Sequence, residues 1–282
     1  MSSGRNGGWI LVFLLVLAPL VVGAIVVASW LGVEVAPIHQ AALIAIATGV
    51  CQALRREPMS RIVGRLDGRW VAQFLLGGLI GSLVMLVPAF LLAAGGRVEW
   101  HRSPATAAAL WSGGLLLFSA ALAEELLFRG FVFQRLIAGL GPWPAQLITG
   151  FFFLLTHLGN QGMTGGTALR AGANIYLASI MLGMANLRTQ SLALPIGLHF
   201  MANFMQGCVL GFGVSGETQP RWLIPVLAAG PEWLTGGEFG LEASLPGLVA
   251  VAAVTFLLYR WPSSPPASRP VDQPIPSARD NS

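Results

Sequence analysis

The sequence of 282 residues contains no lysine, only two cysteines and few charged residues of any kind. Charged side chains make up 10% of the chain, whereas hydrophobic residues make up 55% and the mean hydropathy is +0.70. Such a composition excludes an ordinary soluble domain, in which about a quarter of the residues are charged. It predicts an all-α, polytopic membrane protein.

The two cysteines, Cys51 and Cys208, lie in apolar segments and lack the spacing of a disulfide framework or a metal site. We interpret them as small packing residues. The net charge of +4 comes from arginine alone, and the arginines do not form the clustered basic surface that binds nucleic acid. The sequence therefore predicts no nucleic-acid partner and no cysteine-ligated metal.

Long apolar runs predict about eight transmembrane helices in one bundle. Twelve of the 16 arginines fall on one side of the predicted membrane. Because cytoplasmic loops carry the excess of positive residues, this asymmetry places both termini in the cytoplasm. The arginine-, alanine- and glycine-rich composition favours the inner membrane of a bacterium. The predicted spans are Trp9–Leu31, Pro37–Leu54, Trp70–Ala94, Ala105–Ile137, Pro144–Leu158, Ala168–Leu187, Leu192–Leu210 and Leu245–Tyr259.

The residues divide the chain into four predicted regions. An N-terminal three-helix membrane region covers residues 1–104, and core helices with polar motifs cover residues 105–210. Residues 211–260 are predicted to form an external interfacial segment followed by the last transmembrane helix. Residues 261–282 are rich in proline and serine and cannot bury a core, so they are predicted to form a disordered cytoplasmic tail.

Ionisable residues lie inside several predicted spans. A carboxylate at the middle of a bilayer costs about 2.5–3.5 kcal/mol, so residues of this kind mark a functional site. Histidine and carboxylate side chains together can perform acid–base chemistry. The candidate site residues are Glu124, Glu125, Arg129, His157, His199 and Asn203.

The rise of an α-helix predicts that these residues lie at one level. At 1.5 Å per residue, Glu124 and His157 are each about 21–22 Å from the turn that joins their helices. The same rise places His199 about 16 Å, and Asn203 about 22 Å, from Arg188 at the start of their helix. Three antiparallel helices are therefore expected to bring the polar side chains together.

Spacing along each helix suggests distinct chemical roles. Glu125 and Arg129 are four residues apart with the acid first, which favours a structural ion pair. Glu124 projects about 100° away from Glu125 and has no helical counter-charge, which suits it to act as a general base. His199 and Asn203 are also four residues apart, and both can offer N–H donors to an oxyanion.

Three short motifs follow one another in the core region: Glu124-Glu125-x-x-x-Arg129, Phe153-x-x-x-His157 and His199-x-x-x-Asn203. In this order they resemble the motifs of the CAAX protease and bacteriocin-processing family, which includes type 2 CAAX prenyl proteases. The resemblance covers roughly residues 105–204. It implies an intramembrane endopeptidase with eight helices.

The resemblance implies that the motif residues act in pairs: Glu124 with His157 on the attacking water, His199 with Asn203 on the oxyanion, and Glu125 with Arg129 as a structural brace. Zinc is the alternative to a metal-free site, because two histidines and a glutamate could ligate it. The HExxH motif is absent and a glutamate that activates water needs no metal, so we expect no cofactor.

The resemblance also implies a peptide or protein substrate, lipidated or embedded in the membrane, next to membrane lipids. Prenylated proteins are uncommon in bacteria, which favours a peptide leader or a membrane-protein segment over a prenylated tail. Two other functions stay open at this point, a non-catalytic peptide-binding or immunity protein and a proton-coupled transporter. The sequence shows no internal repeat, which disfavours the transporter, and it leaves the oligomeric state open.

Other features have a weaker signal. Gly77-x-x-x-Gly81 is typical of close helix packing. Asn174 and Asn186 are expected either to line a cavity or to pack between helices. Acidic residues collect in the external segment, which we interpret as an interfacial cover: Glu217, Glu232, Glu238 and Glu242.

Overall fold

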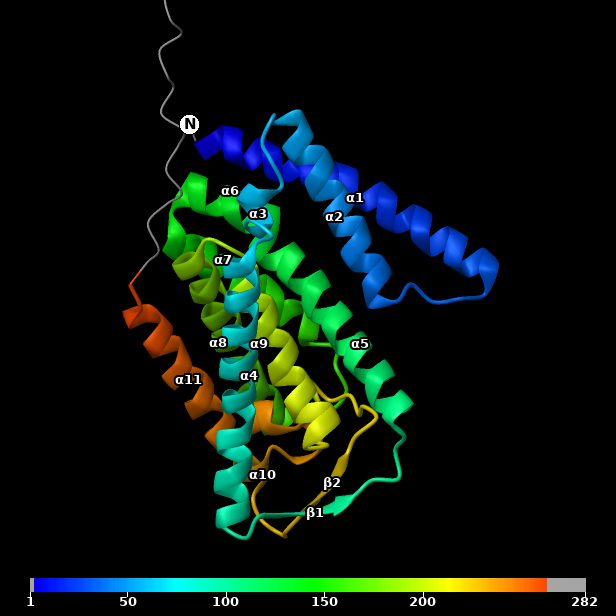
Figure 1. The fold of residues 1–282 in the computed structure, drawn as a ribbon, viewed down its shortest axis with the longest axis vertical. Coiled ribbons are helices and arrows are strands. Elements are labelled where there is room, and N and C mark those ends of the chain that lie inside the picture. The colour runs from blue at the N-terminus through cyan, green and yellow to red at the C-terminus, as the bar shows by residue number, and fades with distance from the viewer. Residues whose placement is uncertain (1–2, 263–282) are drawn as a thin grey trace, which may run out of the picture.

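The computed structural model describes residues 3–262, which form a bundle of helices with one two-stranded β-ribbon (Figure 1). The predicted tail, residues 261–282, therefore lies almost wholly outside the described residues. The main elements are α1 (Ser3–Leu31), α2 (Pro37–Leu54), α3 (Ser60–Val63), α4 (Gly68–Ala94), β1 (Val98–Arg102), α5 (Ala107–Glu125), α6 (Phe131–Leu140), α7 (Pro142–His157), α8 (Gly165–Thr189), α9 (Ala193–Phe204), β2 (Leu223–Leu227), α10 (Glu232–Thr235) and α11 (Leu245–Arg260).

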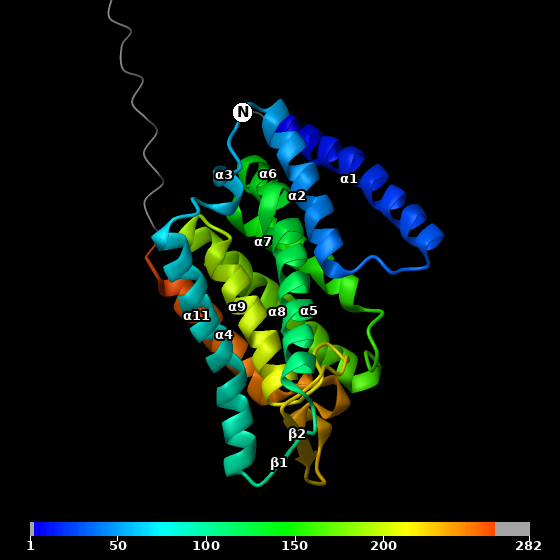
Figure 2. The same cartoon turned by 45° about the vertical axis from the view of Figure 1, so that its right-hand side comes forward.

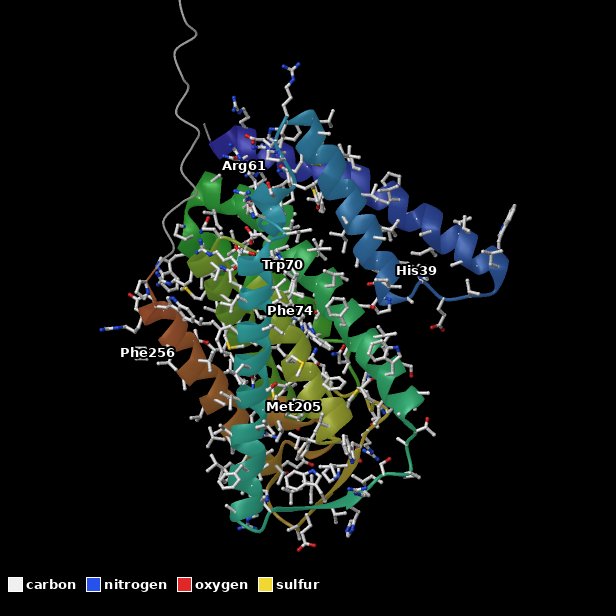
Figure 3. The ribbon with its side chains drawn as sticks, in the orientation of Figure 1. His39, Arg61, Trp70, Phe74, Met205 and Phe256 are labelled. Carbon is white, nitrogen blue, oxygen red and sulfur yellow. The ribbon has the colours of Figure 1, made fainter. Side chains whose placement is uncertain are left out.

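The helical class predicted from composition is confirmed, and each predicted span overlaps one or more helices. Four helical stretches are long and apolar enough to cross a membrane: Gly4–Leu31, Pro37–Leu54, Ser60–Ala94 and Gly165–Thr189. Helix α11 is apolar but shorter. Large apolar side chains cover the outside of the bundle, as Phe256 on α11 illustrates in Figure 3. Such a surface suits contact with lipid rather than with water.

Helices α1 and α2 extend to one side of the bundle, as both ribbon views show (Figures 1 and 2). Helix α1 packs against α2 and α6, and α2 packs against α5. The ring of Phe13 stacks on Phe131 at 5.6 Å between centroids, and both side chains are buried. This aromatic contact joins the N-terminal arm to the core near the start of α6.

The predicted fourth span, Ala105–Ile137, is not one continuous α-helix. The chain runs through α5, a π-helical turn at Leu126–Gly130 called η1, and then α6. At Gly130 the backbone angle ψ is −128°, far from the helical value, so α6 takes a different direction from α5. Glycine tolerates this conformation because it has no Cβ atom.

Helices α4 and α9 lie side by side in both views, and their backbones approach closely (Figures 1 and 2). A Cβ atom added at Gly77 would overlap the carbonyl oxygen of Leu194, and one added at Gly81 would overlap that of Leu198. The helix-packing signature predicted at these glycines is therefore confirmed. This contact matters for function because α9 carries two of the candidate site residues.

A segment after α9, residues 211–244, closes one end of the bundle, and we call it the cover segment. Its strand β2 pairs antiparallel with β1, in the register Val98 opposite Leu227. The indole nitrogen of Trp100 on β1 donates a hydrogen bond of 2.9 Å to the carbonyl oxygen of Leu210. The ribbon is thereby fixed to the end of the bundle formed by α9 (Figure 1).

We expect Gly81→Ala to destabilise the protein by about 1–3 kcal/mol, because a new methyl group would force α4 away from α9. Gly49→Ala is the matched control, since a Cβ atom at Gly49 on α2 meets nothing within 4 Å. Unfolding of both variants in mixed micelles, followed by circular dichroism as the fraction of SDS rises, measures the difference. Equal stability of the two variants would contradict the close α4–α9 contact.

Candidate active site

A cavity of about 490 Å³ lies among α4, α5, α7, α8 and α9. Most of its wall is apolar, and a small number of polar side chains face it. Four of the six predicted site residues line this cavity: Glu124, His157, His199 and Asn203. The other two, Glu125 and Arg129, are buried behind it. A largely apolar cavity with a few convergent polar groups is the usual form of a binding or active site.

The predicted ion pair between Glu125 and Arg129 is present and fully buried. The guanidinium nitrogen Nη1 of Arg129 lies 3.1 Å from Oε1 of Glu125, with side-chain exposures of 1% and 0%. The other terminal nitrogen, Nη2, donates to the hydroxyl and the carbonyl oxygen of Ser179 on α8, at 2.8 and 3.0 Å. A buried arginine needs a counter-charge and acceptors for its N–H groups. Glu125 and Ser179 supply them, so Arg129 links α8 to the end of α5.

His199 on α9 lies between the two adjacent glutamates. Its Nδ1 atom is 2.8 Å from Oε1 of Glu125, and its Nε2 atom is 3.7 Å from Oε2 of Glu124. An ionised carboxylate only accepts hydrogen bonds, so Nδ1 carries the proton that is shared with Glu125. When the ring carries a second proton, Nε2 becomes a donor directed into the cavity.

Glu124 occupies the last turn of α5 but differs from its neighbour in its surroundings. Its Oε2 atom is buried without a hydrogen-bond partner, while the side chain as a whole is 32% exposed and lines the cavity. No arginine among the described residues forms an ion pair with it. The two adjacent carboxylates thus have different environments, one held by Arg129 and one available to a ligand.

Two π-helical turns adjoin the candidate site. The first, η1, begins directly after Glu125 and contains Arg129. The second, η2 (Met205–Val209), follows Asn203 at the end of α9. Single π-helical turns within α-helices are frequent at functional sites, because the wider turn changes the direction of the side chains around it.

His157 at the end of α7 is oriented by its own helix. Its Nδ1 atom lies 2.7 Å from the carbonyl oxygen of Phe153, which can only accept, so Nδ1 carries the proton. In the neutral ring, Nε2 is then an acceptor. The ring of Phe153 lies 4.6 Å from that of His157 and 6.3 Å from that of His199, and the guanidinium carbon of Arg129 lies 4.8 Å from its centre. Phe153 therefore spaces the polar groups apart.

Two asparagines face the cavity with free amide groups. The side chain of Asn203 lines it one helical turn beyond His199 and makes no hydrogen bond to the described residues. Asn174 on α8 also lines it, with only 2% of its surface exposed and its amide nitrogen unpartnered. Asn186 instead donates to the carbonyl oxygen of Ser191, at 3.1 Å, and packs between helices.

The sequence did not identify Glu242, which also lines the cavity. Its carboxylate accepts hydrogen bonds from the Ser215 hydroxyl at 2.7 Å, from the Ser215 amide at 3.2 Å and from Nε2 of Gln206 at 3.0 Å. Burial raises the pKa of the Glu242 carboxyl, and the bonds from Ser215 together with nearby His157 offset only part of that rise. The sequence feature that could have pointed to Glu242 is its position as a carboxylate among apolar residues just before the last predicted span.

Within residues 3–262, no three histidine, cysteine, aspartate or glutamate side chains are grouped so that they could hold a metal ion. Glu125 is already bonded to Arg129 and to His199.

Residues 106–205 match the model of a family described as type II CAAX prenyl endopeptidase, Rce1-like. The matched segment contains all six candidate site residues. The resemblance predicted from the three motifs is thereby confirmed. A search of the curated proteins found no match to this chain.

We expect Arg129→Ala to cost about 3–5 kcal/mol of stability, because it leaves the Glu125 carboxylate buried without its counter-charge. Arg61→Ala is the matched control. Arg61 forms an ion pair of the same i,i+4 spacing with Glu57 at 2.6 Å, but the side chain is 61% exposed. An exposed pair contributes about 0–1 kcal/mol. Unfolding in mixed micelles should separate the two variants, and similar losses would refute the bracing role of Arg129.

Proposed function

We propose that the chain, whose residues 106–205 match the model of the Rce1-like family of type II CAAX prenyl endopeptidases, is a glutamate-dependent intramembrane endopeptidase. It hydrolyses a peptide bond in a protein or peptide that is associated with the membrane. The observation that carries this proposal is the pair Glu124 and His199 in the cavity. Oε2 of Glu124 has no hydrogen-bond partner and lies 3.7 Å from Nε2 of His199.

Glu124 acts as the general base in the first step. Its unpartnered Oε2 atom takes a proton from water, assisted by Nε2 of His157, which is an acceptor in the neutral ring. The hydroxide oxygen forms a bond to the carbonyl carbon of the substrate. The apolar wall of the cavity strengthens the electrostatic interactions of Glu124 during this transfer, because the local dielectric constant is low.

The tetrahedral intermediate carries a negative charge on the former carbonyl oxygen. With His199 protonated on both ring nitrogens, its Nε2–H group and the side-chain amide of Asn203 donate hydrogen bonds to it. The C–N bond then breaks, and the leaving amine takes the proton held by Glu124. Glu125 and Arg129 hold His199 in place, since Oε1 of Glu125 contacts both of them.

We further propose that this reaction needs no metal ion and that all eight predicted spans cross the membrane. The short helices α7, α9 and α11 then complete the bundle around the long ones. The arginine asymmetry of the connections supports placing both termini in the cytoplasm, in a bacterial inner membrane.

We expect Glu124→Gln to reduce the rate of peptide cleavage by about 10²–10⁴-fold, the usual contribution of a general base. The amide keeps the shape of the side chain but cannot take the proton. The assay compares purified variants in liposomes on quenched fluorescent peptides, lipidated and unlipidated, with and without a chelator. Cleavage that persists with chelator supports the metal-free mechanism.

Glu99→Gln on β1 is the control for this loss of charge, because Glu99 is exposed and lies outside the cavity. It should cleave like the wild type. Unchanged cleavage by a well-folded Glu124→Gln protein would rule out the proposed base. A folded wild-type protein that binds peptides without cutting any of them would favour the non-catalytic binding function.

We expect Asn203→Ala to reduce kcat by about 10²–10³-fold with little change in KM, because the lost donor acts on charge that develops in the transition state. Steady-state kinetics on the best peptide give both constants. A rise in KM at constant kcat would assign Asn203 to substrate binding instead.

A further inference from the structure

Apart from two histidines, the titratable side chains that line the cavity are all acidic. Glu124, Glu217 and Glu242 contribute carboxylates, whereas none of the described arginines lines it, and the chain has no lysine. Arg129 lies behind the wall of the cavity, where it donates hydrogen bonds to Glu125 and Ser179. A peptide in the cavity therefore meets carboxylates without a fixed positive partner.

Glu242 differs from the other two because it is held in place. Three donors on two neighbouring elements fix it: both groups of Ser215, and Gln206 on η2. All three donors are neutral, and the described residues supply no ion pair to it. Its carboxylate lines the same cavity as His157 and Glu124. Glu242 is thus a fixed carboxylate near the proposed site of hydrolysis.

A second observation points to a peptide as the occupant. The amide nitrogen of Asn174 is buried in the same wall without a hydrogen-bond partner, and only 2% of the residue is exposed. A buried donor without a partner is costly, so a bound group that accepts a hydrogen bond from it is favoured. A peptide carbonyl oxygen has this chemistry.

We propose that Glu242 is a specificity-determining residue, which selects peptide substrates with a basic side chain near the scissile bond. This inference rests on the endopeptidase function proposed above. A lysine or arginine of the substrate would supply the cation that the wall lacks, while Asn174 would bind a neighbouring carbonyl oxygen. By the same electrostatics, the cavity disfavours a substrate whose free C-terminal carboxylate must lie beside Glu242.

The test uses three quenched peptides that differ at one residue near the cleaved bond, which is lysine, glutamine or glutamate. We expect wild-type kcat/KM to favour the lysine peptide over the glutamate peptide on the order of tenfold or more. In Glu242→Gln this ratio should fall to about one, since glutamine keeps the shape but loses the charge. Thermal unfolding verifies that the variant is folded.

Glu238→Gln is the matched control, because Glu238 lies four residues away and lines a separate hollow of the cover segment. It should keep the wild-type ratio. An equal ratio in wild type and Glu242→Gln, or a preference for the glutamate peptide, would overturn the proposal. If all three peptides are cut at equal rates in a Glu124-dependent manner, the specificity fails while the endopeptidase function stands.

Binding measurements test the specificity of Glu242 independently of peptide hydrolysis. Fluorescence anisotropy measures the dissociation constants of the labelled lysine and glutamate peptides for Glu124→Gln and for the double variant Glu124→Gln/Glu242→Gln. Tighter binding of the lysine peptide that needs Glu242 supports the specificity even if hydrolysis is never seen. Equal binding of both peptides in both proteins counts against it.

Discussion

The buried contact between Glu125 and its two partners holds the proposed site together. One carboxylate oxygen accepts from Arg129 within the same chain segment and from His199 on α9. Arg129 in turn reaches Ser179 on α8. Because a charge in an apolar interior must be paired, neither partner can leave without a large cost. Three helices are therefore held at fixed positions by a single network, and the direction of the His199 ring follows from it.

The same network explains how two adjacent glutamates can differ in role. Successive residues on a helix point about 100° apart, so Glu125 is directed into the protein while Glu124 is directed into the cavity. Glu125 is neutralised by Arg129 and satisfied by His199. Glu124 keeps a buried oxygen without a partner, which leaves it free to take a proton. The proposed reaction depends on this contrast rather than on either carboxylate alone.

Helix packing and the cover segment complete the cavity. The glycines of α4 allow the backbone of α9 to approach closely, which brings His199 and Asn203 to the wall opposite α5. The cover segment adds Glu242 through its bonds to Ser215 and Gln206. Phe74, labelled on α4 in Figure 3, packs edge-on against Phe118 of α5 at 6.4 Å between ring centroids. Apolar contacts of this kind keep the helices in register around a polar centre.

The helical class, the apolar segments and the six candidate residues could be predicted from the sequence, because composition and i,i+4 spacing are local properties. The glycine pair of α4 could be predicted in the same way. The contact of Glu125 with His199, 74 residues away, and that of Arg129 with Ser179, 50 residues away, depend on the folded arrangement of the helices. The turn at Gly130 and the entry of Glu242 into the cavity likewise depend on packing. Contacts between distant segments follow from how whole helices fit together, which no local pattern specifies.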